Sequence, residues 1–305
     1  MDFYADPPGT EVEDGTQFIT ALGGSSANIA VAITRQGGKA ALVTALSDDA
    51  VGRYVRNQLA HYGIDARHVR TVAGQCRTSL AVVETRLENC QSVIYRNNAA
   101  DFEMNGDDID AVDFSQYGAL IATGTCFAAE PSRAATFTAF ERASAAGLPV
   151  ILDLDYRPYS WPSPADAGAI GLRAAQVCDL VVGNDEEFAT LAGGVEAGKT
   201  LARQLAREHG ALVVYKMGEN GSVTFTGNET IETGIFRVEA LKPTGSGDAF
   251  LGNLVSALAN GFSLQESLVR GSAAAAIVVA DVGCSRAMPD HDRLETFMLS
   301  HNGIT

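Results

Sequence analysis

The sequence has little that would tie the chain to a membrane, a disulfide framework or a nucleic acid. No apolar run reaches the ~18 residues that a membrane helix needs, and no basic-then-apolar signal segment opens the chain. The 5 cysteines are dispersed without a C-x-x-C pair, which argues against a zinc site and predicts a cytoplasmic protein. Lys and Arg (22) are outnumbered by Asp and Glu (37), and the net charge of −15 argues against a nucleic-acid partner.

The apolar content and the order of the sequence patterns predict one large α/β domain over residues 1–305. Apolar residues make up 46% of the chain, which is enough for a sizeable core. Apolar, β-rich runs alternate with amphipathic helical stretches such as 51–63 and 131–147. Strand followed by helix, repeated, predicts a mostly parallel sheet covered on both faces. The expected strands lie at 40–46, 118–124, 149–155, 178–184 and 211–218.

Residues 78–97 follow a different pattern, which predicts a hairpin outside the parallel core. Two alternating stretches flank the turn-like "LENC" at 87–90. Together with residues near 16–20 they are expected to form a small lid sheet, built from about 10–22 and 76–100. The exposed edges of such a sheet offer a surface for a homodimer.

One stretch, "GGVEAGKT" at 193–200, matches the phosphate-loop pattern G-x-x-x-x-G-K-[ST]. A working phosphate loop follows a strand and precedes a helix, so that its amides converge on the anion. Here the preceding "NDEEFATLA" predicts an Asn-capped helix that ends at Gly193, and another helix follows. The stretch is therefore expected to be a connecting turn, with Lys199 outside any nucleotide site.

A second glycine-rich stretch, "PTGSGDAF" at 243–250, has a better context. It follows an extended segment and opens an apolar helix, so the amides of Gly245, Ser246 and Gly247 are placed to form an anion hole. Asp248 lies in the first turn of that helix. The residues alone leave two roles open for Asp248, a helix cap or a catalytic base.

Two motifs together resemble the ribokinase-like (PfkB) family of carbohydrate kinases. They are "GGSSANIAVAITRQGGKAALVTALSDDAVG" at 23–52 and "GSGDAF" at 245–250. The resemblance implies a three-layer α/β/α sandwich and transfer of the γ-phosphate of ATP to a sugar hydroxyl. It implies that Asp248 is the base and Gly245, Ser246 and Gly247 the anion hole. The sugar contacts that it implies are Asp2, Gly24, Ser25 and Asn28.

The resemblance also implies where the cofactors ATP and Mg²⁺ are held. Asn184 and Glu187 match an N-x-x-E pattern that lies near magnesium and its waters, although both residues could simply cap a helix. The implied ATP contacts are Lys216, Gly218, Gly221, Ala274 and Cys284. A monovalent cation such as K⁺ stays open as a further cofactor.

Within the family, four stretches resemble the branch that phosphorylates 5-dehydro-2-deoxygluconate in inositol catabolism. They are "YRNNAAD", "LDLDYRPYSW", "EALKPTGSGDAF" and "CSRAMP". Arg96 and Arg157 end strand-like runs, and an arginine fork suits the carboxylate of a sugar acid, although surface ion pairs are the commoner role. The alternatives are a kinase of 2-keto-3-deoxygluconate or fructose, and a non-catalytic sugar-binding relative.

One feature departs from the family pattern at the start of the chain. The family begins with a strand that ends in an acidic substrate contact, and Asp2 matches the contact without a strand before it. The first core strand is therefore expected to be missing or truncated. Either the start of the chain was assigned late, or the domain lacks that strand.

Overall fold

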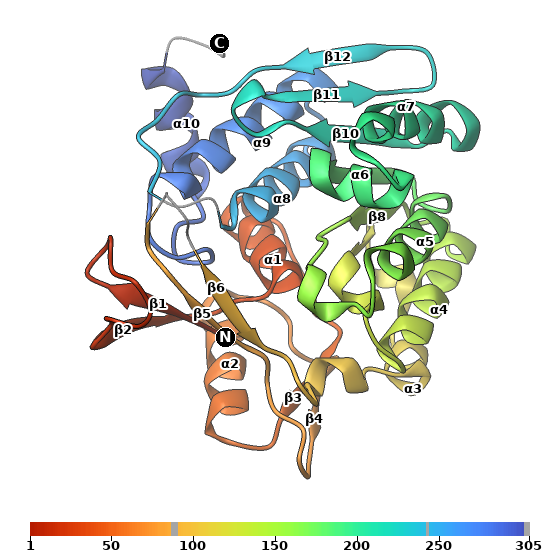
Figure 1. Cartoon of the computed structure of the whole chain (residues 1–305). Coiled ribbons are helices and arrows are strands. Elements are labelled where there is room, and N and C mark those ends of the chain that lie inside the picture. The colour runs from red at the N-terminus through yellow and green to blue at the C-terminus, as the bar shows by residue number, and fades with distance from the viewer. Residues whose placement is uncertain (87–90, 242–243, 302–305) are drawn as a thin grey trace. The chain divides into compact units, whose positions relative to one another are not determined.

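The computed structural model describes residues 1–86, 91–241 and 244–301 (Figure 1). The chain packs as two compact units, which we call unit 1 (1–101 with 234–305) and unit 2 (102–233). Within the described ranges, no helix is both long enough and apolar enough to cross a membrane.

Unit 2 is built around a six-stranded sheet with the order β12-β11-β10-β9-β8-β7. The four strands from β7 to β10 are parallel, whereas β11 and β12 are added antiparallel. The strands are β7 (Leu120–Thr123), β8 (Val150–Asp153), β9 (Leu180–Asn184), β10 (Leu212–Lys216), β11 (Ser222–Phe225) and β12 (Thr230–Thr233). The predicted α/β class and its mostly parallel sheet are confirmed.

Helices connect the parallel strands of unit 2, as the alternating pattern predicts. Helices α4, α6 and α7 pack on the sheet (Figure 1). Strands β8 and β9 are almost wholly buried, which explains why they read as continuous apolar runs rather than alternating ones. The helices are α3 (Gly106–Asp110), α4 (Ser132–Ala145), α5 (Pro164–Ala175), α6 (Asp185–Ala192) and α7 (Gly198–His209).

Unit 1 holds two smaller sheets and five helices among its described residues. The four-stranded sheet has the order β2-β1-β5-β6, and β3 pairs with β4 in parallel. The strands are β1 (Asp2–Asp6), β2 (Gln17–Ala21), β3 (Thr44–Ser47), β4 (Val69–Val72), β5 (Leu80–Val83) and β6 (Ser92–Tyr95). The helices are α1 (Ser25–Arg35), α2 (Ala50–His61), α8 (Ser246–Ala259), α9 (Leu264–Val279) and α10 (His291–Ser300).

The four-stranded sheet contains the segments that were expected to form a lid. Strands β5 and β6 are antiparallel, as the hairpin pattern predicts, and the turn at 87–90 lies outside the described residues. The outer strands β2 and β6 expose the large apolar side chains Phe18, Val93 and Tyr95. Closure of this sheet over a ligand, and a dimer formed through it, stay predictions.

The first residues of the chain belong to the same four-stranded sheet. Strand β1 pairs antiparallel with β2 and parallel with β5, and it is not part of the six-stranded sheet. The expectation of a further core strand ahead of Asp2 therefore stays a prediction.

A close crossing of α1 and α8 organises the core of unit 1. A side chain at Gly252, in the middle of α8, would collide with the methyl group of Ala32 and would lie 3.0 Å from the carbonyl oxygen of Ile29. Both of those residues belong to α1. The missing side chain therefore lets the two helix backbones approach each other, although glycine inside a helix costs about 1 kcal/mol relative to alanine.

The phosphate-loop-like stretch at 193–200 joins two helices, as its context predicts. Helix α6 ends at Gly193, which has φ 72°, and α7 begins at Gly198. A side chain at Gly198 would lie 3.0 Å from the backbone nitrogen of Ala189, so this glycine serves the packing of α6 on α7. Lys199 is exposed.

Lys199→Ala is expected to leave both the affinity for ATP and the turnover number within about twofold of the parent. Lys199 is exposed in the first turn of α7, and a substitution at such a surface position shifts free energies by less than ~0.5 kcal/mol in most cases. Titration of ATP binding and steady-state kinetics provide the measurement. A collapse of nucleotide binding in this variant would place the site at 193–200 after all.

Candidate active site

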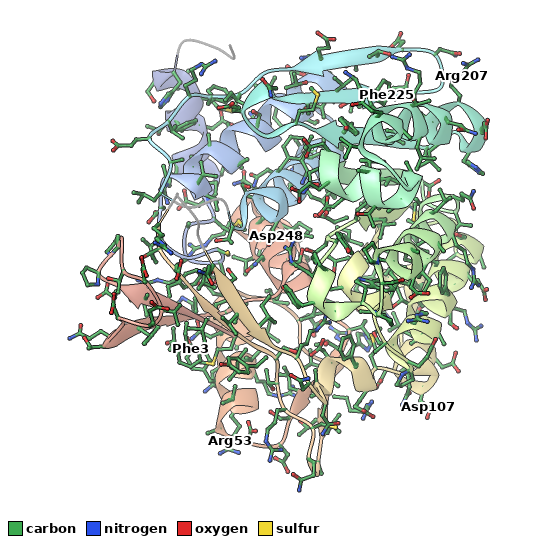
Figure 2. All side chains as sticks on the ribbon, viewed as in Figure 1. Phe3, Arg53, Asp107, Arg207, Phe225 and Asp248 are labelled. Carbon is green, nitrogen blue, oxygen red and sulfur yellow. The ribbon has the colours of Figure 1, made fainter. Side chains whose placement is uncertain are left out.

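Asp248 lies in the first turn of α8 (Figure 2), and two side chains of α1 donate hydrogen bonds to its carboxylate. Ser25 Oγ donates a hydrogen bond of 2.5 Å to Asp248 Oδ1. Asn28 Nδ2 donates one of 2.8 Å to Asp248 Oδ2. The structure therefore brings together the residue expected to act as the base and two residues expected to bind the sugar.

The two helices that meet at Asp248 both begin at a glycine. Gly24 has φ 96° and Gly245 has φ 86°, a backbone region that favours glycine. Neither of these N-cap residues has a side chain that could cap its helix, and the start of a helix favours an anion or a polar ligand. The start of α8 is where Gly245, Ser246 and Gly247 are expected to form the anion hole.

Within the described part of the chain, the side-chain oxygen of Asn28 is buried without a hydrogen-bond donor. Asn28 is 3% exposed, and its Oδ1 atom has no hydrogen-bond partner among the described residues. A buried acceptor left without a donor costs about 1–3 kcal/mol. A hydroxyl group of a bound ligand would supply the missing donor, beside the carboxylate that Asn28 already holds.

Asp2 lies against the turn that leads into α1. A side chain at Gly23 would collide with the carboxylate of Asp2, so this glycine lets the backbone pass directly over that group. Asp2 is 8% exposed. The carboxylate thus lies beside Gly23, one residue before Gly24, which is consistent with the sugar contact that the resemblance implies.

Two of the residues expected to contact ATP are buried in unit 1. Ala274 has no exposed surface and belongs to the main apolar core. Cys284 is also buried, and its sulfur lies 3.0 Å from the hydroxyl of Tyr4. Neither side chain therefore has much exposed surface for a ligand to contact, and their roles in ATP binding stay predictions.

Unit 2 contains a group of buried carboxylates at the ends of β8 and β9, formed by Asp153, Asp155 and Glu187. Burial raises the pKa of Asp153 to about 7, the nearby charge of Lys216 opposes this shift, and Glu187 adds to it. Burial likewise raises the pKa of Glu187. No role was predicted for Asp153 or Asp155, although "LDLD" at the end of a buried strand was a signal for them.

The residues expected near magnesium form a helix cap. Asn184 accepts a hydrogen bond from the backbone of Glu187, and Glu187 Oε2 accepts one of 2.7 Å from the backbone of Asn184. Glu187 Oε1 accepts a further bond of 3.2 Å from the Tyr156 amide. The capping role that the sequence left open is thus present, and a role towards magnesium stays a prediction.

The donor set of unit 2 fits a magnesium ion that is held mainly through water. Among the described residues, no group of three or more His, Cys, Asp or Glu side chains is arranged to bind a metal directly. Magnesium keeps several of its waters and usually takes only one or two carboxylates, so a closed cage is unnecessary. Buried carboxylates whose pKa values are raised would also gain from a nearby cation.

Asp153→Asn is expected to gain stability relative to the parent as the pH rises. A carboxyl group with a raised pKa in the folded chain contributes stability that is complete below its unfolded pKa near 4 and is lost as the pH rises through about 7. The asparagine does not titrate. The free energy of unfolding of the variant minus that of the parent should therefore increase by about 2 kcal/mol from pH 5 to pH 8.

Urea unfolding at both pH values provides this measurement, with the exposed Asp107→Asn as the control (Figure 2). The control reports the effect of exchanging a carboxylate for an amide at an exposed position. A difference between Asp153→Asn and the parent that stays the same from pH 5 to pH 8 would contradict a raised pKa at Asp153.

Both arginines expected to bind a carboxylate already hold one. Arg96 in unit 1 directs two nitrogens to Asp101 Oδ2, at 2.5 and 3.0 Å. Arg157 in unit 2 pairs with Asp155 Oδ1 at 2.7 Å. The ion pairs considered as the commoner alternative are therefore present, and binding of a substrate carboxylate stays a prediction.

The remaining residues expected to contact ATP follow strand β10 in unit 2. Lys216 is the last residue of that strand, and the tight turn after it contains Gly218 with φ 56° and Gly221 with φ 78°. The Met217 amide donates to the carbonyl oxygen of Gly221 across this turn at 2.8 Å. The turn therefore requires glycine for its own conformation, whatever it binds.

Comparisons with known proteins agree with the expected family and fold. The chain matches the pfkB family carbohydrate kinase description over residues 1–291. It is 40% identical to a 5-dehydro-2-deoxygluconokinase of Photobacterium profundum (98% of this chain, 92% of the relative) and 34% identical to one of Geobacillus thermodenitrificans (98% and 90%). A fructokinase of Xylella fastidiosa with bound ATP superimposes with a TM-score of 0.87 at 25% identity, covering 98% of this chain and 95% of that one, which confirms the predicted ribokinase-like fold.

Proposed function

The chain belongs to the pfkB family of carbohydrate kinases, and we propose that it transfers the γ-phosphate of ATP to the primary hydroxyl of 5-dehydro-2-deoxygluconate. The names of its relatives support this keto-deoxy sugar acid as the substrate. The observation that carries the chemistry is the Asp248 carboxylate, held by Ser25 and Asn28 at the start of α8.

Asp248 acts as the general base in this proposal. Phosphoryl transfer needs alignment and charge neutralisation more than covalent chemistry, and the attacking hydroxyl must lose its proton. A carboxylate within hydrogen-bond reach of that hydroxyl accepts the proton. The bonds from Ser25 and Asn28 fix the plane of the carboxylate, so that it meets the hydroxyl in one orientation.

The sugar is bound by residues around the start of α1. Asp2 accepts hydrogen bonds from its hydroxyl groups, and the backbone at Gly24 allows the sugar to approach closely. Ser25 lies beside the base. Asn28 offers its buried Oδ1 atom to a sugar hydroxyl, which removes the cost of leaving that atom without a donor.

Unit 1 and unit 2 each contain residues that suit a phosphate group. The amides of Gly245, Ser246 and Gly247 stabilise the charge that develops on the transferred group. Lys216 and the turn at Gly218 and Gly221 hold the nucleotide. Asn184 and Glu187 would hold the waters of a bound Mg²⁺, which would supply positive charge against the phosphates.

A coupled assay of ADP formation tests the proposal on the parent protein. The acceptors are 5-dehydro-2-deoxygluconate, 2-keto-3-deoxygluconate and fructose, each with ATP and Mg²⁺. We expect the highest kcat/KM with 5-dehydro-2-deoxygluconate. A preference for fructose would leave the kinase activity standing and overturn the sugar-acid substrate, whereas no ADP formation with any acceptor would favour a non-catalytic sugar-binding protein.

A further inference from the structure

A short loop after α9, Gly283–Ser285, joins three separate parts of unit 1. Ser285 is fully buried, and its hydroxyl donates a hydrogen bond of 2.7 Å to the carbonyl oxygen of Leu22, directly before the Gly23 turn. Cys284 contacts Tyr4 of β1 through both its backbone and its side chain. The loop therefore fastens the segments around Asp2 and Gly24 to one point.

The hydroxyl of Tyr4 is the centre of this arrangement. Its oxygen lies 2.9 Å from Asp2 Oδ2 and 3.0 Å from Cys284 Sγ, and it accepts the Cys284 amide proton at 3.1 Å. The hydroxyl has one proton to donate, and a carboxylate accepts it more strongly than sulfur does. We therefore assign that proton to Asp2. Burial also raises the pKa of Tyr4 well above its usual value, so the hydroxyl keeps its proton.

The same loop supports the anion hole from the other side. A side chain at Gly245 would lie 2.6 Å from the sulfur of Cys284, so the backbone at the start of α8 rests directly on that residue. Gly283 has φ 90° and packs near the ring of Tyr4. Tyr4 and Cys284 thus connect the carboxylate of Asp2 to the turn whose amides open α8.

We propose that Tyr4 is a positioning residue, whose hydroxyl holds the Asp2 carboxylate in the orientation that binds the sugar and, through Cys284, in register with the anion hole. This inference rests on the proposed function, because it assigns Tyr4 to the same sugar site. Tyr4 has no exposed surface, so we expect no direct contact between it and the substrate. Its effect on the reaction therefore passes through Asp2.

Tyr4→Phe tests the proposal, because it removes the hydroxyl and keeps the ring. We expect the KM for the sugar acceptor to rise about tenfold, which is ~1.4 kcal/mol, while the KM for ATP stays within about twofold. The turnover number should fall less than the acceptor affinity. Tyr54→Phe is the matched control, since its hydroxyl bonds Thr20 of β2 at 3.1 Å in an exposed position, and its constants should equal those of the parent.

Cys284→Ala provides a second variant in case Tyr4→Phe folds poorly. It leaves the Tyr4–Asp2 hydrogen bond in place, so the acceptor KM should stay within about twofold, while the turnover number falls severalfold as the start of α8 loses its support. An unchanged acceptor KM in folded Tyr4→Phe overturns the inference alone. So does a parallel rise in both KM values with a lower melting temperature, which indicates a structural role only. A parent protein that phosphorylates none of the acceptors overturns the proposed function, and this inference with it.

Discussion

Asp248→Asn is expected to lower the turnover number by ~10²–10⁴, the usual contribution of general-base catalysis, and to leave the affinities for ATP and sugar almost unchanged. The asparagine has the same shape but accepts no proton from the sugar hydroxyl. Its amide oxygen can still accept the hydrogen bond from Asn28, and its NH₂ group can donate to the Ser25 hydroxyl. The substitution therefore removes the basic group and preserves the contacts between α8 and α1.

Single-turnover kinetics with saturating ATP, together with calorimetric titration of the sugar, separate the chemical step from binding in this variant. Asp290→Asn is the matched control, because Asp290 also lies at a helix start, where it caps α10 through the Arg293 amide. The control should keep its turnover within about twofold. If Asp248→Asn turns over as fast as the parent, Asp248 is not the base.

Arg96→Ala and Arg157→Ala are expected to raise the KM for 5-dehydro-2-deoxygluconate by one to two decades. A charge-assisted hydrogen bond to a substrate carboxylate contributes about 1.5–3 kcal/mol, or roughly 10- to 150-fold in affinity. Arg96 should show the larger effect, since its side chain is 16% exposed, whereas that of Arg157 is 45% exposed and more strongly screened by water. The KM for fructose should change far less, because fructose has no carboxylate.

The ion pairs with Asp101 and Asp155 make a control necessary. Removing either arginine also leaves a carboxylate of the protein without this partner, which could disturb the site without any role in substrate binding. Arg142→Ala removes an exposed pair with Asp110 and should leave all constants unchanged. Steady-state kinetics with the acid and with fructose give the ratio of the two changes in KM, which distinguishes substrate binding from a structural role. An equal rise in both KM values would show that the arginines only support the fold.

The elements whose apolar pattern is local were predictable from the sequence. The parallel strands of unit 2 are continuous apolar runs because both faces are covered, and their ends differ from the predicted ones by only a few residues. The placement of "GGVEAGKT" between two helices was also predictable. The capping box at Asn184 and the helix stop at Gly193 each depend on residues that are close together in the sequence.

The contacts that build the candidate site were not predictable in this way. Asn28 and Asp248 are 220 positions apart, and Tyr4 and Cys284 are 280 apart, so no local pattern reports that they meet. The raised pKa of Asp153 depends on burial, which composition does not reveal. The resemblance to a family indicated which residues to expect at the site, but it did not identify Asp101 and Asp155 as the partners of Arg96 and Arg157, because these ion pairs depend on the neighbours of each arginine in the fold.

Gly252 has no reactive atoms, yet the close crossing of α1 and α8 that it permits helps to fix the position of Asp248, the proposed base. The bonds from Ser25 and Asn28 reach Asp248 only while the two helix axes stay at their present separation. An added methyl group at 252 would act one turn of helix away from the base and would displace it as a rigid part of α8. Since misplacement of a reacting group by about 1 Å costs as much as 10²-fold in rate, we expect Gly252 to set the position of Asp248, the proposed base, more strictly than its lack of a side chain suggests.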